Sequence, residues 1–277
     1  MLIRMIMRYS FYYSGQGSGK RNSYSVLPLI LILLLFYGFT WCVYGNSNDT
    51  LIKSAAKHYK AGEYGKAIEN YEKVLASGFE SPELYFNLGN AYYKAGILAS
   101  SILNYERAKR LSPGDEDVNY NLELARRHVV DKIDALPEFF ITAWINKIIN
   151  ITSSDHWANV SIVSFVIFLV LVSVFLFSAK TGLKKFSFLT GIIVIIISAA
   201  SFIFSMKQRN DLLKHDYAII FNPTVTAKSS PDEAGTDLFV VHEGTRISIT
   251  DSIGEWKEIK LSDGNKGWVH KTSIAVI

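Results

Sequence analysis

The chain has 277 residues, of which 49% are hydrophobic and 19% are charged, and its formal net charge is +4. This length is enough for two small domains and membrane segments, and the hydrophobic share suits a protein that lies partly in lipid. The basic excess lies mostly beside apolar runs, where it indicates membrane topology and not nucleic-acid binding. The single cysteine, Cys42, lies inside an apolar run, so an intramolecular disulfide is excluded.

Residues 1–45 combine a basic leader, an apolar run at 26–43 and a small residue at Gly45. This order is typical of a secretory signal. Because Val43-Tyr44-Gly45 is an imperfect cleavage site, we expect either a signal sequence that is removed or an N-terminal anchor that is retained.

The next segment repeats itself after 34 residues. Tyr59-Lys60-Ala61-Gly62 recurs as Tyr93-Lys94-Ala95-Gly96, and Ile68, Asn70, Tyr71 and Glu72 recur as Ile102, Asn104, Tyr105 and Glu106. A period of 34 residues is typical of solenoids of paired helices, which commonly bind other proteins. The repeats are expected at about 48–81 and 82–115, with two helices in each.

The second repeat carries the more regular pattern. Tyr85-x2-Leu88-Gly89-x2-Tyr92, followed by Ser101, Tyr105, Ala108 and Pro113, resembles the tetratricopeptide repeat (TPR). Gly89 allows the neighbouring helix to approach closely. The first repeat is more degenerate, since Ser54 and Ala55 stand where leucine and glycine are usual.

Two repeats need a further helix to cover their end. Residues 116–130 predict it, because Val118, Leu122, Ala125 and Val129 share one helical face and Asp115 is a suitable N-cap. The expected TPR domain, two repeats plus a capping helix, therefore spans residues 48–130.

The TPR resemblance implies a concave groove, lined by the first helix of each repeat, that accepts a peptide. The partner-binding residues expected there are Tyr59, Phe86, Asn87, Asn90, Tyr93, Lys94, Tyr120 and Asn121, with Ile52 and Ala56 beside them. Carboxamides both donate and accept hydrogen bonds, and tyrosines offer rigid area with a polar tip. The alternative is that the asparagines only tie adjacent helices together and the tyrosines only pack.

A juxtamembrane segment is expected at 131–156. Phe140, Trp144, Ile148 and Ile151 fall at helical spacing, which predicts an amphipathic helix in the headgroup layer. The alternative is an ordinary helix packed on the solenoid.

Two uncharged apolar runs, at 157–178 and 188–206, are each near the ~20 residues that cross a bilayer. The loop at 179–187 contains Lys180, Lys184 and Lys185, which predicts a transmembrane hairpin with a cytoplasmic turn. Both soluble parts then lie outside, on the periplasmic side of a bacterial inner (cytoplasmic) membrane. Lys207, Arg209 and Lys214 favour the opposite orientation, with both soluble parts in the cytoplasm.

Residues 207–277 predict a small all-β barrel. Short strands are expected at 240–241, 246–250, 256–261 and 267–270, separated by turns. Gly244-Thr245, Gly254-Glu255-Trp256 and Asp263-Gly264-x2-Gly267-Trp268-Val269 resemble the bacterial SH3 (SH3b) domain. That resemblance implies binding of peptidoglycan peptides or other envelope polymers, with Trp256 and Trp268 as ligand candidates or, alternatively, as core residues.

No catalytic chemistry is expected. His242-Glu243 has no second histidine four residues later, and no nucleophile elbow occurs. Ser14 to Arg21 lacks the first glycine and the Ser/Thr of a phosphate loop. The prediction is a protein that is not an enzyme and has no catalytic residue, metal site or cofactor.

The order of leader, two TPRs, capping helix, membrane hairpin and SH3-like tail resembles BatE-type proteins, the TPR members of the Bat aerotolerance family. The matching stretches are Tyr85 to Lys94, Asn121 to Arg126, Val130 to Ile133 and Ser153 to Trp157. The resemblance implies von Willebrand A-type membrane proteins and a MoxR-like AAA+ ATPase as partners, and a role in envelope integrity or stress tolerance.

The sequence thus predicts a multidomain membrane protein with an all-α TPR solenoid, a transmembrane helical hairpin and a small all-β SH3-like barrel. The expected function is a membrane-anchored adaptor or scaffold whose exported TPR domain binds a segment of an envelope protein, with the SH3-like domain as a second contact. The alternative is an envelope attachment or sensing protein that binds peptidoglycan through the SH3-like domain.

Overall fold

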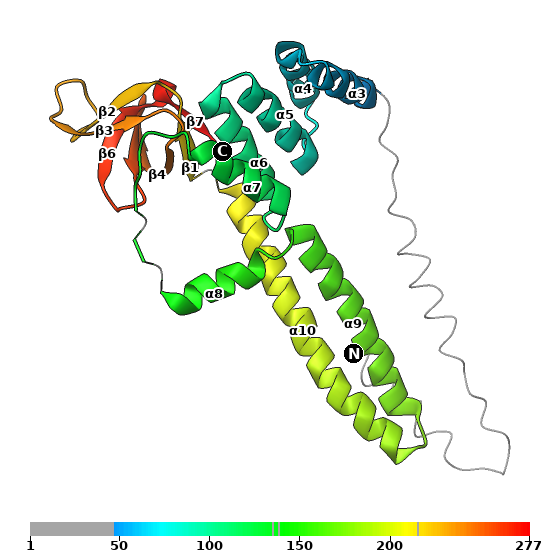
Figure 1. Cartoon of the computed structure of the whole chain (residues 1–277). Helices are drawn as coiled ribbons and strands as arrows, with labels where there is room; N and C mark the ends of the chain where they lie inside the picture. The colour runs from blue at the N-terminus through cyan, green and yellow to red at the C-terminus, as the bar shows by residue number, and fades with distance from the viewer. Residues whose placement is uncertain (1–46, 135, 138, 215) are drawn as a thin grey trace, which may run out of the picture. The chain divides into compact units, whose positions relative to one another are not determined.

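The computed structural model describes residues 47–134, 136–137, 139–214 and 216–277 (Figure 1). The predicted signal sequence or anchor at 1–45 lies outside the described residues. All described elements belong to one compact unit, Gly45–Ile277.

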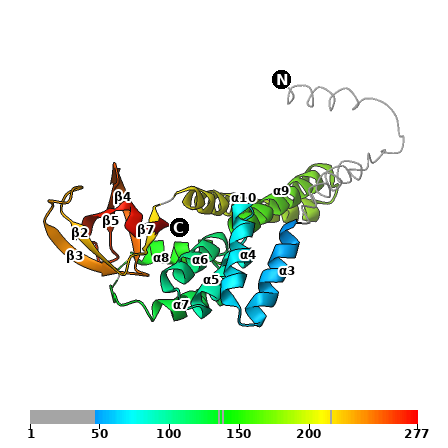
Figure 2. The same cartoon turned by 90° about the horizontal axis from the view of Figure 1, so that it is seen from above.

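The repeat segment forms helices in succession, each in contact with the next (Figure 2). They are α3 (Ser47–Lys60), α4 (Tyr64–Ala76), α5 (Pro82–Lys94), α6 (Leu98–Leu111) and α7 (Glu116–Arg126). Asp115 caps α7 as predicted, since its carboxylate accepts a hydrogen bond from the main-chain N–H of Val118 at 3.0 Å. The α7 helix ends at Arg126, before the predicted end at residue 130.

Gly89 brings α5 and α6 together, as the sequence predicted. A Cβ at this position would lie 2.7 Å from the Tyr105 ring, a distance that real Cβ atoms do not adopt. The Tyr105 side chain fills the space that glycine leaves and is almost completely buried. The close contact of the two helices therefore depends on a residue without a side chain.

Three further helices follow, α8 (Phe140–Ile149), α9 (Ser154–Phe177) and α10 (Thr181–Leu213). Among the described residues, α9 and α10 are long and apolar enough to cross a membrane, by length and composition. Residues 178–180 alone connect them, so α10 takes in most of the loop predicted at 179–187. The reason is local: lysine is a good helix former, and Gly182 falls in the first turn, where it interrupts little.

Helices α9 and α10 form a hairpin (Figure 1). The residues buried along it are mostly small, whereas many of its large apolar side chains are exposed. Ser161 Oγ donates to the carbonyl of Ser198 at 3.0 Å, and Ser198 Oγ donates to the carbonyl of Ser161 at 2.9 Å. Ser187, Gly191 and Ser201 are also buried along α10. Small residues and interhelical hydroxyl bonds are typical of helices that pack in lipid, where burial of apolar surface gives no drive to associate.

Polar contacts close the end of the hairpin at which the soluble parts attach. Gln208 of α10 donates to the carbonyls of Ile149 and Thr152 at 2.8 and 2.9 Å, and the Trp157 indole donates to the carbonyl of Ile149 at 2.9 Å. A Cβ on Gly114, in the turn between α6 and α7, would collide with the main chain of Ile151. The TPR segment thus touches the α8–α9 connection directly.

The C-terminal part is one antiparallel sheet in the order β3-β2-β6-β5-β4-β1-β7. Its strands are β1 (Tyr217–Ile220), β2 (Thr224–Lys228), β3 (Asp237–His242), β4 (Arg246–Ile253), β5 (Trp256–Lys260), β6 (Lys266–His270) and β7 (Ile274–Val276). The strands predicted from the sequence correspond to β3, β4, β5 and β6, while β1, β2 and β7 were not predicted.

The predicted barrel is not closed, because β3 and β7 are both edge strands. Helix α6 supplies the reason at one edge: Arg107 donates to the carbonyl of Val276 at 2.8 Å, and Arg110 donates to that of Ile277. A helix that satisfies edge groups removes the need for a further strand there.

The sheet and the TPR helices share one hydrophobic core. Ile219 and Ile277 of the sheet pack with Ile102, Leu122 and Val129 of the helical part. Helix α6 is therefore buried on two sides, against α5 and against the sheet, so the β part completes the solenoid and is not a separate module on a tether.

Candidate functional site

The predicted groove contains a hydrogen-bonded triad from α5, α6 and α7. The Asn90 carboxamide oxygen accepts from the Tyr105 hydroxyl at 2.6 Å and from the Asn121 carboxamide nitrogen at 2.9 Å. Within the described ranges, the Asn90 nitrogen and the Asn121 oxygen have no protein partner. The pair thus presents one donor and one acceptor, which is the complement of a single peptide unit.

Three other predicted residues are available for contact. Tyr120 is 68% exposed, Lys94 is exposed, and Asn87 is half-buried. Over the described part of the chain, the carboxamide of Asn87 and the ammonium of Lys94 make no hydrogen bond or ion pair to the protein. These side chains add a cation, an amide and an aromatic ring on α5 and α7, the helices that carry Asn90 and Asn121.

The remaining predicted aromatic residues mainly pack. The Tyr93 hydroxyl lies 3.1 Å from His128 Nε2, and the Phe86 ring lies 6.0 Å from that of Tyr105. Tyr59 packs edge-on against Tyr64 at 5.5 Å between ring centroids. Burial is the main cause that raises the pKa of Tyr59. The structure thus places part of the set in helix packing, as the alternative held, and leaves part of it open to a ligand.

Trp256 and Trp268 lie on one face of the sheet. Trp256 pairs with His270 across β5 and β6, and Trp268 pairs with Glu258, two residues further along β5. Side chains alternate along strands, so the core residues Ile259 and Val269 point to the opposite face. Both tryptophans are half-buried and outside the core clusters of the described residues.

Sequence reasoning missed a buried carboxylate, Glu106. It accepts a hydrogen bond from Arg126 of α7, and Arg246 Nε of β4 lies 3.5 Å away. The Arg246 guanidinium stacks 3.9 Å over the Tyr217 ring. Glu106 thus links a repeat helix, the capping helix and the sheet.

The 34-residue repeat contained a signal for this residue. Glu72 stands at the equivalent position of the first repeat and accepts a hydrogen bond from the Tyr92 hydroxyl. Tyr92 and Arg126 are themselves equivalent in the repeat, so the same bond joins each second helix to the next helix in the chain. A glutamate that recurs at the repeat interval therefore predicts a hydrogen bond between the second helix of a repeat and the helix that follows it.

Asp131 was also missed as a contact residue. Its carboxylate accepts from the main-chain N–H and ring Nδ1 of His242, both at 2.7 Å, and from the Thr245 hydroxyl at 2.6 Å. Two residues later Ile133 packs on the core of the sheet. The first part of the segment predicted as juxtamembrane therefore fastens the capping helix to the sheet, and α8 begins only at Phe140.

We expect Asp131→Ala to weaken this attachment by about 2 kcal/mol, the usual scale for hydrogen bonds to a charged group. Burial alone would raise the pKa of Asp131, but the hydrogen bonds from Thr245 and His242 outweigh it and lower the pKa. The contact therefore contributes fully above the ordinary aspartate pKa of about 3.9 and is lost as the pH falls through the lowered value.

The measurement for Asp131 is amide hydrogen exchange of residues 130–137 in the purified chain. Asp134→Ala is the matched control, because Asp134 is exposed and makes no hydrogen bond or ion pair with the described residues. Equal exchange in the two variants would contradict the assigned role of Asp131.

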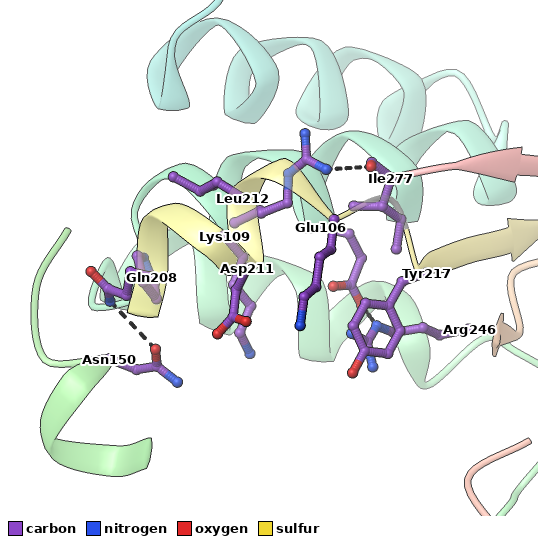
Figure 3. A pocket seen from close by; sticks show the side chains of 12 residues that line it. Glu106, Lys109, Asn150, Gln208, Asp211, Leu212, Tyr217, Arg246 and Ile277 are labelled. Carbon is purple, nitrogen blue, oxygen red and sulfur yellow. Dashed lines mark hydrogen bonds and ion pairs between the residues drawn. The ribbon is translucent and has the colours of Figure 1, made fainter. Parts of the chain in front are cut away.

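A pocket of about 240 Å³ lies among α6, the end of α10 and the sheet (Figure 3). Most of its lining residues have polar or charged side chains, although the surface they expose to the pocket is more apolar than polar; they are Glu106, Lys109, Arg110, Pro113, Asn150, Gln208, Asp211, Leu212, Lys214, Tyr217, Arg246 and Ile277. None of these residues was predicted as a site. No cluster of three or more His, Cys, Asp or Glu that could hold a metal ion occurs among the residues that the structure describes.

Comparison with known proteins identifies the repeats. Residues 57–96 match the family model "TPR repeat", and residues 82–115 match "Tetratricopeptide repeat", which has the bounds predicted for the second repeat. No curated protein matches the chain. Among solved structures, the chain is similar to the crystal structure of MamA, at 18% identity and a TM-score of 0.29, over 60% of this chain and 80% of that one. The chain therefore contains tetratricopeptide repeats, whose general role is protein–protein interaction and scaffolding.

Proposed function

We propose that the chain is a membrane-anchored adaptor whose TPR groove binds an extended segment of another envelope protein. The observation that carries this proposal is the Asn90–Asn121 pair, which has a donor and an acceptor not used by the described protein, on the helices that also carry Asn87, Lys94 and Tyr120. Tyr105 holds the Asn90 carboxamide in place. A preorganised amide pair binds a peptide unit with little further loss of entropy.

The anchor in this proposal is the α9–α10 hairpin. Its outward face carries large exposed apolar side chains, among them Phe165, Ile193 and Phe202. In water such a surface would be an aggregation site, whereas in lipid it needs no further cover. Helix α8 adds Phe140 and Trp144, which suits a helix at the headgroup layer beside the hairpin.

Location and partners follow the resemblance to BatE-type proteins. We propose a bacterial inner membrane with the TPR and SH3-like parts on the periplasmic side, and von Willebrand A-type proteins with a MoxR-like ATPase as the partner system. The basic residues at the α9–α10 connection support this orientation. Cysteines introduced at Gly182 and Asp134 provide the test: a membrane-impermeant thiol reagent applied to intact cells with a permeable outer membrane should label Asp134→Cys and not Gly182→Cys.

The groove is tested by Asn87→Ala combined with Lys94→Ala. Neither side chain bonds to the rest of the described protein, so the variant should fold normally and lose partner binding by about tenfold or more. Asn90→Ala is a poorer probe, because it removes the acceptor of the buried Tyr105 hydroxyl and so changes stability as well.

The measurement for the groove is recovery of crosslinked adducts from native membranes, with the crosslinker at position 120. Lys73→Ala on α4 is the control, since Lys73 is exposed and its ion pair is with Glu69 on the same helix. If the double variant recovers the same adducts at the same level as Lys73→Ala, the groove is not the binding site.

A second function is favoured by the face that carries Trp256 and Trp268. Two half-buried aromatic rings on the face opposite the sheet core suit a platform for peptidoglycan peptides, in line with the SH3b resemblance. The test uses the whole chain in detergent, because Ile219 and Ile277 need the helices for their burial. Co-sedimentation with purified peptidoglycan should fall in Trp256→Ala/Trp268→Ala and persist in Leu238→Ala; no co-sedimentation of the wild type would exclude this function.

A further inference from the structure

The pocket beside α10 has an excess of positive charge. Four cationic side chains line it, Lys109, Arg110, Lys214 and Arg246, against two carboxylates, Glu106 and Asp211. Arg126 already pairs with Glu106 from outside the lining. The side chains of the lining therefore carry an excess of positive charge, which favours an anionic ligand.

Lys109 is the cation least satisfied by the protein. It is half-buried, and within the described residues it forms no ion pair. Burial is the main cause that lowers the pKa of Lys109, and the nearby charges of Glu106 and Glu123 offset it only in part. Figure 3 shows side chains from α6, α10 and β4 around this pocket, among them Lys109, Asp211 and Arg246.

The polar contacts around the pocket leave room for a ligand. Arg246 Nε lies 3.5 Å from Glu106, and Arg110 donates to the carbonyl of Ile277, while Lys214 is exposed and forms no ion pair with the described residues. Asp211 likewise has no ion-pair partner in that part of the chain. Two free ammonium groups and a partly used guanidinium thus surround a space that is large enough for a phosphate group.

The pocket lies where the apolar part of α10 ends. Gln208 and Asp211 belong to the last two turns of that helix and Lys214 is its C-cap, directly after the apolar stretch that ends at Met206. Asn150 belongs to the connection between α8 and α9. If α9 and α10 cross a membrane as proposed above, this level is that of the lipid headgroups.

We propose that this pocket binds the phosphate group of an anionic phospholipid headgroup, with Lys109 and Lys214 as its main cationic contacts. The choice of a lipid as the source of the phosphate rests on the proposed membrane anchor. The binding of a phosphate group as such does not rest on it. A headgroup held there joins the TPR helices, the sheet and the hairpin, and so fixes the groove close to the membrane surface.

The experiment titrates short-chain phosphatidylglycerol into the purified full chain in neutral detergent and measures the apparent Kd by native mass spectrometry. Lys109→Gln should weaken binding by about tenfold, and Lys214→Gln should weaken it in the same direction. Asp211→Asn removes a carboxylate from the same pocket and should strengthen binding severalfold.

Lys207→Gln is the matched control. Lys207 lies one turn from Asp211 on α10 and carries the same positive charge as Lys109. It contacts Asn146 and does not line the pocket. Weakening by Lys207→Gln equal to that by Lys109→Gln, or no strengthening by Asp211→Asn, would overturn the proposal, because diffuse surface charge would then explain the binding.

Two further arms identify the source of the phosphate. Inorganic phosphate that competes at a similar concentration would overturn the lipid assignment, and phosphatidylcholine that binds equally well would overturn the anionic preference. Failure of the chain to enter nanodiscs would count against the membrane anchor alone, since the detergent titration still tests the pocket.

Discussion

Glu106→Gln is expected to destabilise the folded chain by about 3 kcal/mol, the lower end of the range for breaking a buried ion pair. The Glu106 side chain is only 7% exposed, and its charge is matched by Arg126 and Arg246. A neutral amide leaves two guanidinium groups facing each other without their shared counterion. The loss stays at the low end because both arginines keep part of their surface in water.

Urea denaturation of the detergent-solubilised chain measures this loss, and Glu123→Gln is the matched control. Glu123 bonds to the same Arg126 at 2.7 Å, but its side chain is 63% exposed. An exposed pair of this kind contributes at most about 0.5 kcal/mol. If the two variants lose the same stability, Glu106 does not act as a buried link between repeat, cap and sheet.

The helical half of the fold could be predicted because its signals are local. The 34-residue period, Gly89 against Tyr105, and the Asp115 cap each depend on residues close in sequence, and each is present in the structure. The two long apolar helices are equally plain in the sequence.

The β part was predicted only where turns and alternation marked it. Strands β1 and β7 escaped because each has three or four residues, and because their apolar side chains, Ile219 and Ala275 among them, serve a core shared with the TPR helices. The apolar residues of these two strands are therefore placed to pack against helices that lie far away in the sequence. The open sheet has the same cause, since α6 takes the place that barrel closure would fill.

The candidate sites, too, could be predicted only in part. The groove residues were found from repeat positions, but the sequence could not tell which of them bond to each other, as Asn90 and Asn121 do. The pocket beside α10 was beyond prediction, because Lys109, Asp211 and Arg246 lie far apart in sequence and meet only when three elements pack together.

Ile102→Ala is expected to destabilise the chain by about 3 kcal/mol and, in addition, to loosen the sheet. Ile102 is fully buried, and its Cδ1 atom lies against Gly244, where a Cβ would approach it to 3.0 Å. Truncation removes buried methyl groups and leaves a cavity between α6 and the sheet. Because Ile219 and Ile277 line the same core, strands β1 and β7 should lose protection with it.

Hydrogen exchange of residues 217–220 and 274–276 separates this effect from a general loss of stability. Leu88→Ala is the matched control, since Leu88 is almost as deeply buried but belongs to the separate core cluster that α5 shares with the first repeat. Both variants should unfold more easily, yet only Ile102→Ala should speed exchange in β1 and β7 under native conditions. Equal exchange would mean that the sheet is stable without α6, and that an isolated C-terminal part could then bind its ligand independently of the groove.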